Sequence, residues 1–286
     1  MSARFFTLPL AIFVFLGSTQ AKARGPLATV TAADLGGRPA RSVGSPTDGH
    51  LEGGVELRPG PTLKLRRSAG PRWGLPELVA MIERAARQVS KRHPGSVLLV
   101  GDLSRREGGE IGRHQSHESG RDADVGFYLA DQQSQPVSSD RFLRVGWDGR
   151  AVDAPHLRFD DERNWLLVQS FLTDPGTRVQ HIFVAEPVRQ RLLSYARRKG
   201  VYLPVLHRAA IAMKQPSRGL PHDDHFHVRI ACPVGQSGQR PAAANTIVGQ
   251  SGQRPGLCRA EPRALAGAPV GEPRRRPARD ELARSR

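Results

Sequence analysis

Histidine and aspartate side chains gather in two short segments of this chain. Residues 112–124 hold His114, His117 and Asp124, and residues 221–229 hold His222, His225 and His227. Two neutral imidazoles and one carboxylate form a ligand set that suits Zn²⁺ and leaves a fourth coordination position for water. The two clusters therefore indicate a catalytic metal site.

The local sequence explains how these side chains converge. Residues 225–230 are predicted to form a strand, in which His225 and His227 share one face while Phe226 and Val228 point into the core. Gly120 lies between His117 and Asp124, where a glycine permits a sharp turn that brings both side chains to one point. An unligated imidazole would then lie beside the metal, available to move protons.

Three simpler explanations compete with this one. A single His-x-His on a strand is often a surface or packing feature, and His114 and His117 are also compatible with polar loop positions. A structural zinc site usually fills all four positions, mostly with cysteine, and neither Cys232 nor Cys258 lies close to the clusters in the sequence. Two clusters that each hold a ligand pair favour an open, catalytic site.

Hydrophobic periodicity predicts the elements that must position these residues. Three helices are expected. The first spans 75–91, the second begins after a cap at Asp160 or Asp161, and the third spans 187–199, where Gly200 can end it. Strands are expected at 96–100, 123–128, 180–185 and 225–230, and residues 101–120 form a long loop. The pattern predicts an α+β fold with a small, mostly antiparallel sheet flanked by helices in a single catalytic domain.

Composition divides the chain into three parts. A positive start, an apolar stretch at 5–16 and an A-x-A site ending at Ala23 predict a cleavable signal peptide over 1–23, with a membrane anchor as the weaker alternative. The catalytic domain is expected over 24–233, with an irregular arm to about residue 70. Residues 234–286 contain an octapeptide that occurs twice, few large apolar side chains and many arginines, which predicts a low-complexity, basic, disordered tail.

Charge and cysteine content narrow the class of partners. The formal net charge of +16 favours polyanions, which include nucleic acid, membrane surfaces and anionic envelope polymers. No basic run alternates with aromatic residues as a nucleic-acid groove requires, so nucleic acid is not expected. No second apolar run reaches the length of a membrane span. For an exported chain, Cys232 and Cys258 are expected to form a disulfide.

The combined motifs resemble a known family. His117, Gly120 and Asp124 in the spacing H-x-x-G-x-x-x-D, followed by His225-x-His227, resemble the zinc peptidases grouped with lysostaphin, the D-alanyl-D-alanine peptidases and the hedgehog signalling domain. Residues 101–104, 119–124 and 225–229, with the His114/His117 pair, look like the penicillin-insensitive murein endopeptidases within that group. The resemblance covers about residues 40–233.

The resemblance implies one Zn²⁺ per chain, bound by His117, Asp124 and His227. It also implies that His225 acts in catalysis with support from His222, and that His114 lies near the metal. Asp122 is expected beside the ligands, and Arg113, Arg121 and Arg229 are candidates to meet substrate carboxylates.

The implied activity is periplasmic hydrolysis of D-alanyl–diaminopimelyl cross-links in peptidoglycan, insensitive to penicillin. A D,D- or L,D-carboxypeptidase and a non-catalytic zinc or wall-binding module are the alternatives. One departure from the family is the longer segment between the two cysteines. Oligomeric state has no signal in the sequence.

Overall fold

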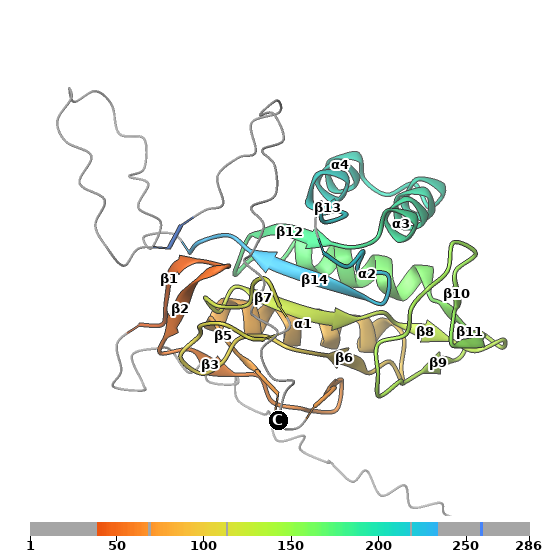
Figure 1. Cartoon of the computed structure of the whole chain (residues 1–286). Coiled ribbons are helices and arrows are strands. Elements are labelled where there is room, and N and C mark those ends of the chain that lie inside the picture. Colours follow the sequence, from red (N-terminus) through yellow and green to blue (C-terminus); the bar gives the residue numbers. More distant parts are fainter. Residues whose placement is uncertain (1–38, 68–69, 113, 218, 234–257, 260–286) are drawn as a thin grey trace, which may run out of the picture. The chain divides into compact units, whose positions relative to one another are not determined.

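A computed structural model describes residues 39–67, 70–112, 114–217, 219–233 and 258–259. Its main sheet has six strands in the order β13-β12-β14-β7-β6-β4 (Figure 1). These strands are β4 (Leu63–Leu65), β6 (Leu98–Val100), β7 (Asp122–Gly126), β12 (Val179–Phe183), β13 (Met213–Lys214) and β14 (His225–Ile230). The four central strands β12, β14, β7 and β6 are antiparallel to one another in turn, while β13 pairs in parallel with β12 and β4 pairs in parallel with β6.

The register of the central strands decides which residues share a face. His227 of β14 lies opposite Asp124 of β7 and opposite Phe183 of β12, and His225 lies opposite Gly126. Because side chains alternate along a strand, Phe226, Val228 and Ile230 point to the other face. There they are fully buried, so the hydrophobic core fixes the histidines on the opposite face.

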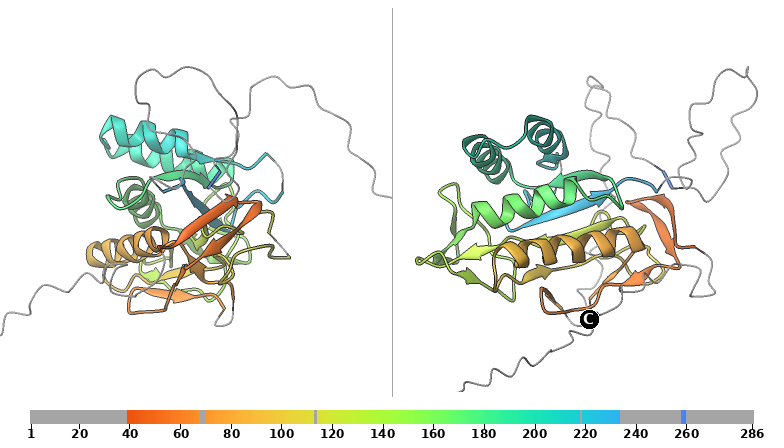
Figure 2. Two further views of the ribbon diagram at one scale, coloured as in Figure 1. Left: turned by 90° about the vertical axis from the view of Figure 1, so that its left-hand side faces the viewer. Right: turned by 180° about the vertical axis from the view of Figure 1, so that it is seen from behind.

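Two helices cover the apolar face of this sheet, as the view from behind shows (Figure 2). They are α1 (Pro76–Arg92) and α2 (Asp161–Leu172). α1 has Pro76 in its first turn and buries one stripe that includes Leu78, Ile82 and Val89. α2 begins at Asp160, whose side chain accepts a hydrogen bond from the Arg163 backbone N–H.

The remaining elements lie at the margins of the main sheet. α3 (Glu186–Arg198) and α4 (Leu203–Ala212) pack against each other, and α4 also contacts β12 and β13. A second sheet has the order β10-β11-β8-β9, built from β8 (Leu129–Ala130), β9 (Pro136–Val137), β10 (Arg150–Ala151) and β11 (Ala154–Phe159). Two small ribbons pair β1 (Arg41–Ser45) with β2 (Asp48–Glu52) and β3 (Val55–Glu56) with β5 (Trp73–Gly74).

The α+β prediction is confirmed, and so are the helices and strands expected from periodicity, with ends shifted by at most two residues. The predicted irregular arm is wrong from Arg41 onward, where β1 to β4 form. These strands are short and rich in turns, so they lack the periodic pattern of a longer strand, yet Leu51, Leu57 and Leu63 are buried by them. The second sheet and α4 were also not predicted.

The predicted disulfide is present, with the Cα atoms of Cys232 and Cys258 5.8 Å apart. The proposed signal peptide and almost all of the predicted tail lie outside the described residues, so those boundaries stay predictions. None of the helices in the described part of the chain has the length and apolar character that a membrane span needs.

Candidate metal centre

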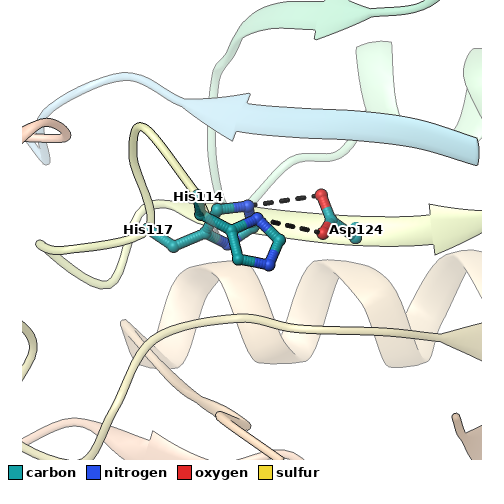
Figure 3. Close-up of side chains that lie close together, drawn as sticks. All are labelled: His114, His117 and Asp124. Atoms are coloured by element: carbon teal, nitrogen blue, oxygen red, sulfur yellow. Dashed lines mark ion pairs between the residues drawn. The ribbon is translucent and has the colours of Figure 1, made fainter. Parts of the chain in front are cut away.

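A loop and a central strand bring three potential ligands together (Figure 3). Ligand atoms of His114, His117 and Asp124 all lie within 4.8 Å of one another. His117 Nε2 is 3.3 Å from Asp124 Oδ1, and His114 Nδ1 is 3.7 Å from Asp124 Oδ2. The two histidines come from the loop that leads into β7, and Asp124 lies in the middle of that strand.

Strand β14 adds two more imidazoles to the same carboxylate. His227 Nδ1 is 3.4 Å from Asp124 Oδ1, and His225 Nε2 is 3.3 Å from the same oxygen. The His117 and His227 rings lie edge to face with centroids 4.6 Å apart. Both sequence clusters therefore meet at Asp124, as the sequence predicts.

Two buried atoms at this meeting point have no hydrogen-bond partner. They are His117 Nε2 and Asp124 Oδ1, which face each other at 3.3 Å. Leaving a buried polar atom unsatisfied costs about 1–3 kcal/mol, so most are paired in folded proteins. A nitrogen lone pair and a carboxylate oxygen directed at one point form a set that a divalent cation fits.

Hydrogen bonds behind the imidazoles fix which nitrogen faces this point. His117 Nδ1 donates to the Leu103 carbonyl at 2.8 Å, which leaves the Nε2 lone pair directed at Asp124. His227 Nε2 donates to Asp122 Oδ1 at 2.8 Å, which leaves Nδ1 free to act as a ligand. Such outer hydrogen bonds orient histidine ligands in metal proteins. The pattern favours His117 Nε2, Asp124 Oδ1 and His227 Nδ1 as one ligand set.

The turn that carries His117 is held by buried polar contacts. The Ser104 hydroxyl donates to the His117 carbonyl and accepts from the Gly120 N–H. His117 has a φ of +77° and Gly120 a φ of +74°. A positive φ is unfavourable for a residue with a side chain, so the surrounding contacts must stabilise the His117 conformation.

Charges around the ligands suit a bound cation. Burial alone would raise the pKa of Asp124, but His117 and His225 hold that pKa well below its usual range. Burial alone would also raise the pKa of Asp122, but Arg229 and His227 hold it well below its usual range. Burial is the main cause that lowers the pKa of His227 to about 4, so its imidazole is neutral near pH 7. Neutral imidazole is the form that binds metal.

His225 and His222 lie beside the ligands, and their rings are 4.9 Å apart. His225 Nδ1 contacts Asp224 Oδ1 at 2.5 Å. Burial by itself lowers the pKa of His225, but Asp124 and Asp224 outweigh it and raise that pKa to about 9 in the metal-free protein. Burial and the neighbouring His225 lower the pKa of His222, whose φ is +57°. The pair can accept and donate a proton next to Asp124.

His114 connects the ligand cluster to an open cavity. Its Nε2 is 3.1 Å from Asp102 Oδ2, and this bond to His114 is the main cause that lowers the pKa of Asp102. A cavity of about 320 Å³ adjoins this pair, lined by Arg67, Pro71, Asp102, Ile111, Gly112 and His114. A substrate can therefore approach the cluster from the His114 side.

Comparison with known proteins identifies the family of this chain. The family described as penicillin-insensitive murein endopeptidase matches residues 42–253, which include every residue of the cluster. The chain belongs to this family.

Curated relatives of the same description support the assignment. The chain is 28% identical to a penicillin-insensitive murein endopeptidase of Klebsiella pneumoniae over 232 residues, which cover 79% of this chain and 78% of the relative. A protein of the same name from Haemophilus influenzae is 29% identical, with 69% of this chain and 66% of the relative covered. One from Escherichia coli is 28% identical, with 78% and 77% covered. Family membership places this chain among the peptidases.

The structure places two of the predicted substrate-binding arginines in the interior of the protein. Arg121 is fully buried, and its guanidinium donates to the Cys232 sulfur at 3.3 Å and to the Arg259 carbonyl at 2.9 Å. Arg229 is also buried and pairs with Asp122 at 2.6 Å. Both arginines contact other parts of the protein, so neither can meet a substrate in this arrangement. Arg113 lies outside the described residues.

Two residues at the site had no assigned role in the sequence analysis. Asp102 lies inside the 101–104 motif, but its contact with His114 depends on the fold of the loop. Phe142, which stacks on His225, lies in a segment without regular structure, and no sequence signal indicated it.

Proposed function

We propose that this chain is a zinc-dependent murein endopeptidase that hydrolyses D-alanyl–diaminopimelyl cross-links in peptidoglycan. The observation that carries the proposal is the convergence of His117 Nε2, Asp124 Oδ1 and His227 Nδ1 in a buried cluster. Family membership supports the peptidase class and the murein substrate. The cation would be one Zn²⁺ per chain.

His117, Asp124 and His227 would hold the zinc. When bound, Zn²⁺ supplies a Lewis acid that polarises a carbonyl and lowers the pKa of a coordinated water to about 7. Asp122 and the Leu103 carbonyl keep the two imidazoles in the ligating orientation. His114 lies near enough to Asp124 to orient that carboxylate or to complete the ligand set.

His225 would serve as the acid–base residue. Its Nε2 lies 3.3 Å from Asp124 Oδ1, so the ring is beside the carboxylate that would bind the metal. It would accept the proton of the attacking water and pass it to the nitrogen of the departing amine. Asp224 holds the opposite edge of the ring, and His222 contributes a second imidazole beside it. No serine acts as a nucleophile in this scheme, so penicillin would find no serine to acylate and would not inhibit the enzyme.

Export completes the proposal. Residues 1–23 would direct the chain to the periplasm, where a disulfide is stable and the substrate is located. The positive charge of the chain would favour anionic envelope polymers. N-terminal sequencing of the protein recovered from the periplasm tests this part, and a mature chain that begins after Ala23 is expected.

Metal analysis combined with digestion of purified cross-linked muropeptide dimers tests the enzyme itself. The wild-type chain should contain one zinc and convert dimers to monomers in a chelator-sensitive reaction. His227→Ala should lose both zinc and turnover, whereas His225→Ala should keep zinc and lose turnover by about 10²–10⁴-fold. The exposed His207 is the matched control, and His207→Ala should behave as wild type.

Three outcomes would contradict the proposal. Full hydrolysis by His227→Ala would refute the ligand assignment. Release of terminal D-alanine without cleavage of dimers would identify a carboxypeptidase. Murein binding without any product would identify a wall-binding module.

A further inference from the structure

A phenylalanine lies flat on the proposed acid–base histidine. The Phe142 and His225 rings are stacked, with centroids 4.9 Å apart and planes 18° from parallel. Phe142 belongs to residues 138–149, which form no helix or strand between β9 and β10. The position of the ring therefore depends on the contacts that this loop makes with its surroundings.

Two glycines provide the space for this ring. A Cβ added at Gly101 would lie 2.8 Å from Phe142 Cζ, and one added at Gly126 would lie 3.0 Å from Phe142 Cδ1. Real Cβ atoms essentially never approach another atom below 3.0 Å. Neither glycine has a positive φ, so backbone conformation does not require glycine at these positions. The ring does.

The same loop also holds the chain segment that precedes His225. The Val145 backbone N–H donates to the Asp223 carbonyl at 2.8 Å, and Arg144 Nε donates to Asp223 Oδ2 at 3.0 Å. Leu143 and Val145 are buried and anchor the loop in the core. Residues 142–145 thus contact both the ring of His225 and the backbone two residues before it.

The outer side of this arrangement is charged. The Arg66 guanidinium lies over the Phe142 ring, 4.8 Å from its centroid, and Arg66 also lies 3.8 Å from Asp102. A cation in this position is attracted to the negative face of the aromatic ring. Phe142 is therefore held by neighbours on several sides.

We propose that Phe142 is a positioning residue that sets the ring plane of His225. This proposal rests on the function proposed above. The χ2 torsion of histidine is broad, so a hydrogen bond at one nitrogen leaves the ring free to rock. Asp224 holds the Nδ1 edge of His225, and Phe142 holds its face. Together they direct Nε2 toward Asp124 Oδ1, so that Nε2 can receive the proton beside that carboxylate. Misplacing a catalytic group by about 1 Å can cost about 10²-fold in rate.

Steady-state kinetics on muropeptide dimers separates positioning from simple packing. Phe142→Leu keeps apolar volume but removes the flat ring. It should lower kcat about 10-fold and leave KM within about 2-fold, with zinc content unchanged. The loss is limited because the His225 ring would still adopt the required orientation part of the time. Gly126→Ala should lower kcat in the same way by displacing the ring. Gly60→Ala, where an added Cβ meets nothing within 4 Å, is the control and should match wild type.

The double variant gives the sharper test. If both changes act through the ring, Gly126→Ala should add little to the loss already caused by Phe142→Leu. Losses that multiply would overturn the proposal, as would a kcat for Phe142→Leu within 2-fold of wild type. A loss confined to KM, or one that follows loss of zinc, would also overturn it, because the effect would then not pass through His225.

A spectroscopic measurement distinguishes this inference from the proposed function. In protein labelled with ¹³C-histidine, the ring protons of His225 should be shifted upfield by Phe142, with the signal assigned by its absence in His225→Ala. The shift should disappear in Phe142→Leu and persist in Gly60→Ala. An unchanged His225 signal in Phe142→Leu refutes the stacking. If the His225 signal does change in Phe142→Leu but the wild-type protein does not cut dimers, only the proposed function is refuted.

Discussion

Replacing Asp122 with asparagine perturbs the buried carboxylate that contacts both His227, a proposed metal ligand, and the guanidinium of Arg229. Asp122 Oδ1 accepts from His227 Nε2 at 2.8 Å and from Arg229 Nε at 2.6 Å. Neither Asp122 nor Arg229 is accessible to solvent to any useful extent. The substitution keeps the shape of the side chain and one oxygen, but it removes the negative charge and permits an amide N–H to face the histidine.

The structure gives two magnitudes for this change. Breaking a buried ion pair by removing one partner costs about 3–5 kcal/mol. Since asparagine retains an acceptor oxygen, the expected loss in the free energy of unfolding is near the lower end, about 3 kcal/mol. Loss of the hydrogen bond behind a histidine ligand typically lowers metal affinity about 10–100-fold, so zinc affinity should fall in that range while the ligands themselves remain.

Two assays test these values. Urea denaturation with chelator present measures the stability of the metal-free protein, and competition with a chromophoric chelator measures zinc affinity. Asp148→Asn is the matched control, because Asp148 is 43% exposed and lies 3.7 Å from Arg150; an exposed pair contributes at most about 1 kcal/mol. Wild-type zinc affinity in Asp122→Asn would refute the argument that Asp122 fixes the orientation of the His227 ring.

Three further changes have expected outcomes. Burial alone would raise the pKa of Asp174, but its hydrogen bonds from Arg84, at 2.8 Å, hold that pKa below the usual value. Asp174→Asn should therefore destabilise the protein at pH 7. Urea denaturation should show that the difference in stability from wild type shrinks as pH falls below about 3.9. Replacing Cys232 and Cys258 together with serine should lower the free energy of unfolding by about 3–4 kcal/mol, measured by the same method against the oxidised wild type, and an unchanged midpoint would contradict it. Gly120→Ala should lower the melting temperature and the zinc content together, because the position has a φ of +74° and an added Cβ would lie 2.6 Å from a buried leucine side chain; normal values of both would show that the turn tolerates a side chain.

The part of the site that the sequence predicts depends on local patterns. His225 and His227 alternate with buried residues, so the strand at 225–230 and the face of its histidines follow from periodicity alone. The spacing of His117, Gly120 and Asp124 likewise indicates a turn into a strand. These predictions needed no knowledge of distant contacts.

The remainder depends on contacts between segments far apart in the chain. The role of Phe142 requires Gly101, Gly126 and His225 to meet, and none of them is near it in sequence. Arg121 was a candidate for substrate binding because it lies within the ligand motif, but the fold places its guanidinium against the disulfide. The short strands β1 to β4 bury isolated leucines between turns, a pattern that local periodicity does not detect.

The disulfide allows the number of residues between Cys232 and Cys258 to vary without changing the catalytic site. Cys232 and Cys258 are 26 positions apart, and the repeated octapeptide lies between them. Both ends of this segment are anchored: the Ala231 N–H donates to the Arg178 carbonyl, and the Arg259 N–H donates to the Gly44 carbonyl, each at 2.8 Å. In general, doubling the number of residues between two fixed points adds only about 0.6 kcal/mol to the cost of closure. Descendants of this chain can therefore gain or lose copies of the octapeptide at little energetic cost, and an affinity tag grafted there should leave peptide-bond hydrolysis intact.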